Sequence, residues 1–274
     1  QTSFSIKKPH KFKNKEIEER FSQAEKGITK DSFIVRAKES MGRFFKGFVR
    51  KYIDLPRDGR FAQAHNTLRK YEAQQDSSDL KAERLIDSLV GSFSKDEFKL
   101  FQRAVIMNDL KRDFDSGKPL PFGFDEDTFM DEFNALDEQV TPRVYDKIVQ
   151  RQKVIQSMLK QLVDAGILNE DLLNEDPNYF HHQVLEYSKI REGSSSMSEL
   201  KKPKPGYGKK RKGTELDINA NYLQSEFAYL KQAYNDLATV RAIDEIADNY
   251  DIKDTLVDKD DIPEGYVEWQ PDKG

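Results

Sequence analysis

The sequence predicts an all-α protein, a bundle-like array of several helices with a long C-terminal helix and little or no strand. Apolar residues recur at spacings of three and four through most of the chain, which is the period of an amphipathic helix. Cap residues precede several of these patterns. Charged residues make up 34% of the chain and hydrophobic residues 36%, a balance typical of helices with narrow apolar stripes.

The first third of the chain contains several helical patterns. A weak helical pattern runs from Glu16 to Gly27. Asp31 and Ser32 are positioned to cap a helix with apolar residues from Phe33 to Tyr52. After a turn at residues 55–59, two further patterns run from Phe61 to Gln75 and from Asp79 to Val90.

The middle of the chain has the strongest start and stop signals. Ser94 with Glu97 forms a capping-box pattern before a helix that runs to about Phe114. Residues 115–124 contain Gly and Pro and predict a break that acts as a hinge. Asp125 is expected to cap the next helix, and Thr141 followed by Pro142 to start another. Gly166 is expected to end that helix.

The C-terminal third contains the longest helical pattern. Residues 179–187 are aromatic and predict either a strand or a packed loop. From residue 222 onward the apolar positions step by four and three in coiled-coil fashion, at Leu223, Phe227, Leu230, Tyr234 and Leu237. Such a stripe either packs in the chain's own core or pairs with another chain.

These patterns divide the chain into five regions. We expect a basic N-terminal arm with a short helix at 1–30, a helical domain at 31–192 and a basic linker at 193–213. A long helix packed on the helical domain follows at 214–250, and an acidic tail at 251–274.

Composition excludes some classes of chemistry. The chain has no cysteine, so disulfides, thiol catalysis and cysteine-based zinc sites are excluded. No apolar run approaches the roughly 20 residues of a membrane span, and no signal peptide is visible. The sequence starts with Gln1, which suggests a processed product, a trimmed chain or part of a longer protein.

Charge is distributed unevenly, although the net charge is only −4. The most basic segment, residues 201–213 (KKPKPGYGKKRKG), has seven basic residues and no acid. Such a segment can neutralise phosphates without reading bases, and an aromatic ring within it can stack on an unpaired base. A solvated linker or a contact with an acidic protein surface is the alternative. The candidate contacts with nucleic acid or another anion are Lys201, Lys202, Lys204, Tyr207, Lys209, Lys210, Arg211 and Lys212.

Catalytic and metal-binding patterns are weak, and we expect no catalytic residue, metal or cofactor. His182 and Glu186 have the i,i+4 spacing of a metal pair, but the sequence favours a hydrogen-bonded histidine packed among the aromatic residues Tyr179, Phe180 and Tyr187. We expect instead a structural lock against neighbouring helices, formed by Tyr179, Phe180, His181 and His182.

Three separated blocks resemble a known group of proteins. They are Phe98–Phe124, which ends in LPFG, then Val163–Tyr187, which contains AGIL and PNYFHHQVLEY, and Pro203–Tyr222, PKPGYGKKRKGTELDINANY. Their order and spacing resemble a helical region of the large polyvalent proteins of bacteriophages and conjugative elements, over roughly residues 33–250. The resemblance implies a phage or mobile-element origin and a protein that is packaged in the virion and delivered with DNA. It assigns no catalytic residue.

Three functions follow as hypotheses. The first is a non-enzymatic scaffold or connector, with other modules of the same polyprotein or virion proteins as partners, located in the virion or the host cytoplasm. The second is a module that binds DNA or RNA through the basic segment. The third is an enzyme, a nuclease or protease, whose site is assembled from scattered acids and His182.

Overall fold

The computed structural model describes residues 10–35, 62–168, 170, 180 and 214–247. Of these residues 74% are helical and 1% are in strand, without a sheet, which confirms the all-α prediction. The principal helices are α1 (Lys15–Ala24), α3 (Ala62–Val90), α4 (Lys95–Asp115), α5 (Glu126–Asp137), α6 (Pro142–Asp164) and α8 (Tyr222–Ala247).

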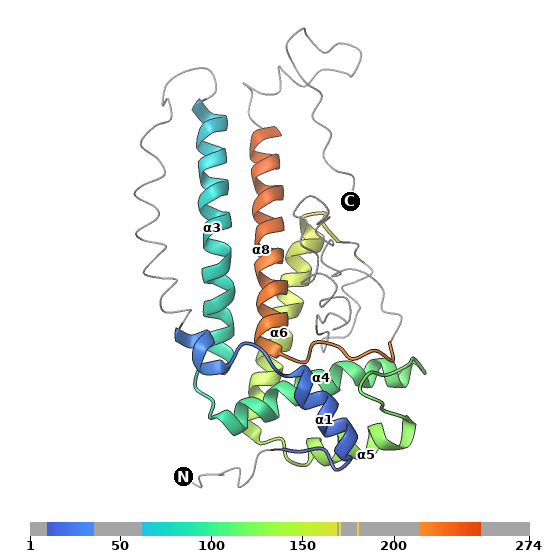
Figure 1. Ribbon diagram of the computed structural model, residues 1–274. Coiled ribbons are helices and arrows are strands. Elements are labelled where there is room, and N and C mark those ends of the chain that lie inside the picture. Colours follow the sequence, from blue (N-terminus) through green and yellow to red (C-terminus); the bar gives the residue numbers. More distant parts are fainter. Residues whose placement is uncertain (1–9, 36–61, 169, 171–179, 181–213, 248–274) are drawn as a thin grey trace, which may run out of the picture.

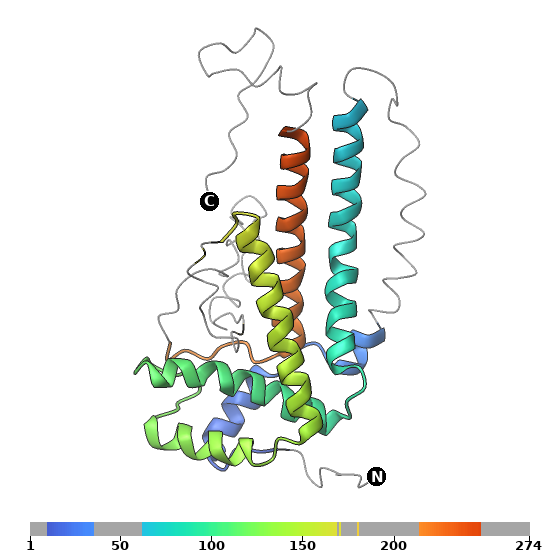
Figure 2. The same ribbon diagram turned by 180° about the vertical axis from the view of Figure 1, so that it is seen from behind.

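Two long helices stand on a base of shorter ones. Helices α3 and α8 lie side by side and run in opposite directions, while α4 crosses the molecule near their lower ends, close to α1 and α5 (Figures 1 and 2). α6 rises from the base beside α8 but ends below the upper ends of α3 and α8. Ion pairs Lys70–Glu245 and Lys231–Asp79 cross between α3 and α8 and confirm their antiparallel pairing.

Cap chemistry fixes where several helices begin. The predicted capping box is present, because the Ser94 hydroxyl accepts from the backbone of Glu97 and the Glu97 carboxylate accepts from the backbone of Ser94. Asp125 caps α5 in the same reciprocal way with Thr128. Thr141 caps α6 with proline in the first turn, also as predicted. Each cap satisfies amide groups that the first helical turn leaves without a partner.

One predicted helix start was wrong, and two helical patterns belong to a single helix. A helical segment begins at Lys30, not after Ser32, because the Thr29 hydroxyl accepts from the Ser32 amide and takes the cap position. The patterns expected at Phe61–Gln75 and Asp79–Val90 form one helix. The Ser77 and Ser78 hydroxyls bond back to the Gln74 carbonyl, so these serines stay within the helix that they seemed to interrupt.

The predicted hinge at residues 115–124 is a packed turn. Leu120, Phe122 and Phe124 are buried in the core. Phe122 and Gly123 both have positive φ, 65° and 76°. A left-handed phenylalanine is uncommon, and here the Asp217 carboxylate accepts from the Phe122 amide at 3.0 Å and holds the turn. Burial and this long-range bond make the segment a fixed corner.

The last helix is shorter than the predicted region 214–250. Residues 214–221 are not helical, and α8 begins at Tyr222, capped by Asn221, whose side-chain oxygen accepts from the Gln224 amide. The predicted stripe is buried within this chain at Leu223, Leu230 and Leu237, and α3 makes the largest helix contact with α8.

Helix α4 is the centre of the base. Every residue from Leu100 to Met107 is buried, whereas an ordinary surface helix buries only one stripe. Gln102 and Arg103 lie within this buried stretch. Because a buried charge is costly unless it is paired and hydrogen-bonded, the packing of α4 requires polar partners from other helices.

Candidate functional site

The sequence-predicted site residues fall mostly outside the described part of the chain. The anion-contact residues Lys201, Lys202, Lys204, Tyr207, Lys209, Lys210, Arg211 and Lys212 lie outside it, as do Tyr179, His181 and His182. Their predicted roles stay predictions. Thr214, which follows the basic segment directly, donates its amide to the Pro119 carbonyl between α4 and α5.

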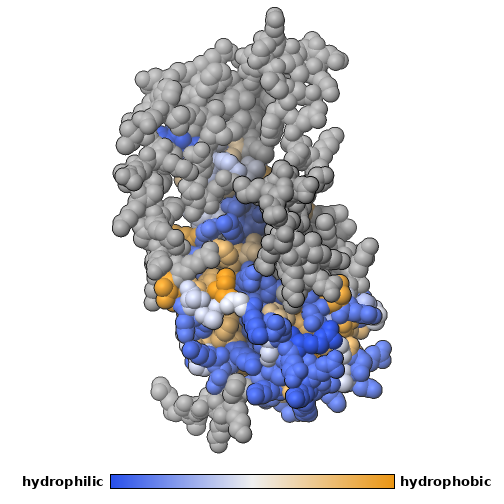
Figure 3. Space-filling view, in the orientation of Figure 1, coloured by the Kyte–Doolittle hydropathy of each residue, from blue (hydrophilic) through white to orange (hydrophobic). Residues whose placement is uncertain are grey.

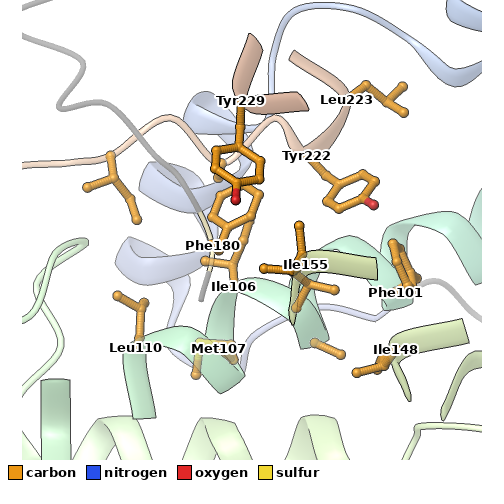
Figure 4. Packing of buried hydrophobic residues seen from close by; sticks show 14 of the residues in the cluster. Phe101, Ile106, Met107, Leu110, Ile148, Ile155, Phe180, Tyr222, Leu223 and Tyr229 are labelled. Atoms are coloured by element: carbon orange, nitrogen blue, oxygen red, sulfur yellow. The ribbon is translucent and has the colours of Figure 1, made fainter. Parts of the chain in front are cut away.

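Phe180 is the one predicted lock residue that the structure describes, and it is buried. Its ring is stacked on Tyr222 of α8, with centroids 6.2 Å apart, and the Arg151 guanidinium of α6 lies 5.7 Å from its centroid. Its amide donates to Asp109 of α4 at 3.0 Å. Phe180 therefore contacts three helices. Figure 4 shows it among the buried side chains of the core.

Arg151 and Glu226 form a buried, two-pronged ion pair between α6 and α8. Arg151 Nε and Nη2 each donate to one carboxylate oxygen of Glu226 at 2.8 Å. The two side chains are 2% and 1% exposed, so solvent does not screen the pair. Parallel bonds of this kind fix orientation as well as distance. Burial alone would lower the pKa of Arg151, but the charge of Glu226 raises it.

Tyr222 completes this group. Its hydroxyl lies 3.4 Å from Glu226 Oε1, and burial together with the Glu226 charge raises its pKa well above the ordinary value. The phenol therefore stays neutral at physiological pH and acts as a donor beside the ion pair.

Arg103 forms a second buried group between α4 and α1. Its guanidinium, with no side-chain exposure, donates to Glu18 Oε2 at 2.6 Å and to Glu25 Oε1 at 2.8 Å. Burial by itself would raise the pKa of Glu18, but the hydrogen bond from Arg103 outweighs it and lowers that pKa to about 2. The guanidinium also lies over the rings of Phe12 and Phe21, which adds cation–π attraction.

Gln102 connects the two groups. Its side-chain nitrogen donates to Glu25 Oε1 at 3.1 Å, and its side-chain oxygen accepts from the Tyr222 amide at 3.0 Å. A continuous set of polar contacts thus joins α1, α4, α8 and α6. We call it the polar network, and it consists of Glu18, Glu25, Gln102, Arg103, Arg151, Tyr222 and Glu226.

Two hollows lie near these helices. The larger, about 530 Å³, borders the polar network at Glu25 and Gln102, and its lining also contains Lys26, Lys30 and Lys95. Lys30 donates to the Phe93 carbonyl and Lys95 pairs with Asp31. The smaller hollow, about 190 Å³, lies between α4, α5 and α6.

The bonds of the network join side chains of this chain to one another. Its carboxylates face guanidinium groups, and the hydrogen bond from Arg103 keeps the pKa of Glu18 well below its ordinary value. In the part of the chain that is described, no three His, Asp or Glu side chains group as metal ligands. None of the helices described there is long and apolar enough to span a bilayer.

Sequence reasoning missed the polar network. The signal was present in LFQRAVIM, where Gln102 and Arg103 interrupt an apolar run. A buried arginine requires acids nearby, but the chain has 49 acids. Nothing local to Arg103 selects Glu18 and Glu25, which lie 85 and 78 residues away.

Comparison with known proteins adds no assignment, because no protein-family description, curated protein or solved structure matches this chain.

Proposed function

We propose that this chain is a non-enzymatic helical connector, a module that holds a fixed geometry between other protein parts. The observation that carries the proposal is the polar network. It joins helices from the beginning, middle and end of the described chain through contacts to two almost fully buried arginines. A buried pair contributes little net stability but penalises other arrangements, and a defined geometry is what a connector requires.

The α3–α8 pair supplies the extended part of the connector. At about 1.5 Å per residue, the 29 residues of α3 span roughly 43 Å. Ion pairs at both Lys70–Glu245 and Lys231–Asp79 favour one register of the two helices. Their upper ends extend beyond α6 (Figure 1). Such a pair separates what binds at its far end from what binds at the base.

The resemblance of three sequence blocks supports the setting that we propose. The connector belongs to a polyvalent protein of a phage or mobile element, with other modules of that protein or virion proteins as partners. It acts in the virion or in the host cytoplasm.

The experiment is to follow the intact protein, with a small tag, through gradient purification of the particles of the element that encodes it. We expect the protein to migrate with complete particles at a constant ratio to the coat proteins. A protein that stays in the host lysate and never migrates with particles would overturn the virion setting.

A second candidate is nucleic-acid contact through residues 201–212. The seven basic residues of the segment favour it, and Thr214 is anchored to the α4–α5 connection immediately after it. In this alternative the helical base is a support for a phosphate-binding segment.

A further inference from the structure

The smaller hollow has the size of a pocket for a single side chain. It occupies about 190 Å³ between α4, α5 and α6, which come together in the base (Figure 2). Pockets for whole small molecules are usually about 300–1,000 Å³, whereas a cavity of about 150 Å³ accepts one benzene ring. One leucine or phenylalanine side chain therefore matches this volume better than a cofactor does.

The pocket has an apolar floor and an exposed aromatic rim. Met107, Leu136 and Ile148 line it and are at most 5% exposed. Tyr145, which also lines it, is 59% exposed. Among the side chains whose burial the structure describes, only one other large hydrophobic residue, Val35, is comparably exposed. An exposed tyrosine beside an apolar hollow is typical of the residues that dominate protein–protein binding energy.

The α5 segment, which forms one side of the pocket, is strongly acidic. Residues 125–142 contain seven acids and no lysine or arginine. One of the acids, Asp137, lines the pocket itself. Six acids of this segment are exposed, and none of them is in an ion pair with another described residue: Asp125, Glu126, Asp127, Asp131, Asp137 and Glu138. Figure 3 shows a mostly hydrophilic surface over this lower part of the molecule.

Other acids of the base are used internally, which makes this segment different. Glu18, Glu25 and Asp217 each bind an arginine. Carboxylates without an ion-pair partner beside an apolar pocket, here Asp137 and other acids of the α5 segment, repel an acidic polypeptide and attract a basic one. The charge pattern therefore favours polypeptides in which basic residues flank the apolar side chain.

We propose that the α4–α5–α6 pocket binds a partner polypeptide that inserts one aliphatic or aromatic side chain between lysines or arginines. The apolar side chain fills the hollow against Met107 and packs on Tyr145. The flanking cations lie against Asp137 and the exposed acids of α5. This inference stands apart from the connector role, because the pocket would bind such a segment in any setting.

The test uses the full chain and two synthetic peptides, one with lysines on both sides of a central leucine and one with serine in place of that leucine. Binding is measured by fluorescence anisotropy at low and moderate salt. We expect the leucine peptide to bind roughly tenfold more tightly than the serine peptide. Added salt should weaken the binding of both peptides, since the flanking contacts are exposed.

Variants locate the binding. Tyr145→Ala should weaken binding of the leucine peptide about tenfold, and Asp137→Asn should weaken its binding several-fold. Val35→Ala and Asp164→Asn are the controls, an exposed apolar residue and an exposed acid outside the pocket lining, and should leave binding unchanged. Equal binding of the two peptides, or binding that Tyr145→Ala does not alter, would overturn the proposal.

Two further outcomes would assign the pocket to another occupant and also overturn the proposal. If the chain forms a dimer that Tyr145→Ala dissolves, a second copy is the occupant. If replacing the seven basic residues of 201–212 by serine tightens binding of the leucine peptide, the chain's own basic segment is the occupant.

Discussion

Arg151 and Glu226 bind each other through two parallel hydrogen bonds of 2.8 Å, in a site where neither side chain is more than 2% exposed. The pair joins α6 to α8 and lies beside Phe180 and Tyr222. A buried ion pair of this kind adds little net stability to the fold. Loss of one partner is costly, however, because the other charge would then be buried without a partner.

Arg151→Met should therefore destabilise the fold by about 3–5 kcal/mol, since it leaves the Glu226 carboxylate buried and unpaired. Urea unfolding followed by circular dichroism measures the change. The double variant Arg151→Met/Glu226→Leu should regain much of the loss, because no charge then remains in the site. Lys153→Met, an exposed position on the same helix, is the control and should stay within about 0.5 kcal/mol. A double variant as unstable as the single one would show that the charge of Glu226 is not the cause.

Asp217 holds the corner at Phe122, and its removal should be costly for two reasons. Asp217→Ala breaks the bond to the Phe122 amide and the two bonds from Arg20. We expect a loss of about 1–3 kcal/mol, the usual cost of leaving a buried donor without its acceptor. The free energy of unfolding gives the value, with Glu215→Ala as the exposed neighbouring control. A loss no larger than that of the control would contradict this role.

His10 should make the fold sensitive to mild acid. Burial first, and then the charge of Arg103, lowers its pKa to about 4 from 6.5, against an opposing effect of Glu18. The unfolded chain then binds a proton that the folded chain refuses, so stability falls as pH drops from about 6.5 to 4. Thermal melts across this range should show a smaller fall for His10→Phe than for the natural chain. Parallel curves for the two proteins would exclude His10 as the cause.

Glu18 should cause a further loss of folding stability at lower pH. Its pKa of about 2 lies below the ordinary 4.5, so its contribution is complete above pH 4.5 and disappears as pH falls toward 2. Glu18→Gln should therefore destabilise the chain at pH 7 and become progressively closer to the natural chain below pH 4.5. Chemical unfolding at a series of pH values checks this, and a gap that stays constant down to pH 2 would contradict it.

Asp236 on α8 should affect folding stability in the opposite direction to His10 and Glu18, with stability falling as pH rises. Burial raises its pKa to about 6 from 3.8, so the folded chain favours the protonated form. Deprotonation then lowers stability as pH rises from about 4 to 6. Asp236→Asn should raise the melting temperature at pH 8 and change it less at pH 4. Asp244→Asn, exposed on the same helix, should show no such difference.

The nucleic-acid alternative has its own test. If all seven basic residues of 201–212 contact duplex phosphates, the logarithm of the binding constant should fall with the logarithm of salt concentration at a slope of about −6. Replacement of the seven by serine should abolish retention at low salt. Retention that survives the replacement would assign DNA binding to another surface.

Local chemistry explains which parts of the fold were predictable. The caps at Ser94, Asp125 and Thr141 need only residues within one turn, so the sequence shows them directly. The helical patterns on either side of residues 76–78 join into one helix, in which Ser77 and Ser78 bond back to the Gln74 carbonyl.

The polar network could not be predicted, because its bonds connect segments far apart in sequence. Arg103 in an apolar run showed that partners must exist but not which carboxylates they are. The packing of the break at residues 115–124 could not be predicted for the same reason. Gly and Pro indicate the break, but its bond to Asp217, distant in sequence, is not visible in the local pattern.

Cross-linking mass spectrometry of purified particles tests the connector role most directly. Lysines on the α3–α8 pair, such as Lys70, and lysines of the base, such as Lys99, offer separate attachment points. We predict that the two sets cross-link to different protein parts within the same particle. Particles that contain all their coat proteins but no peptide of this chain, or cross-links from both sets to one and the same site, would contradict it.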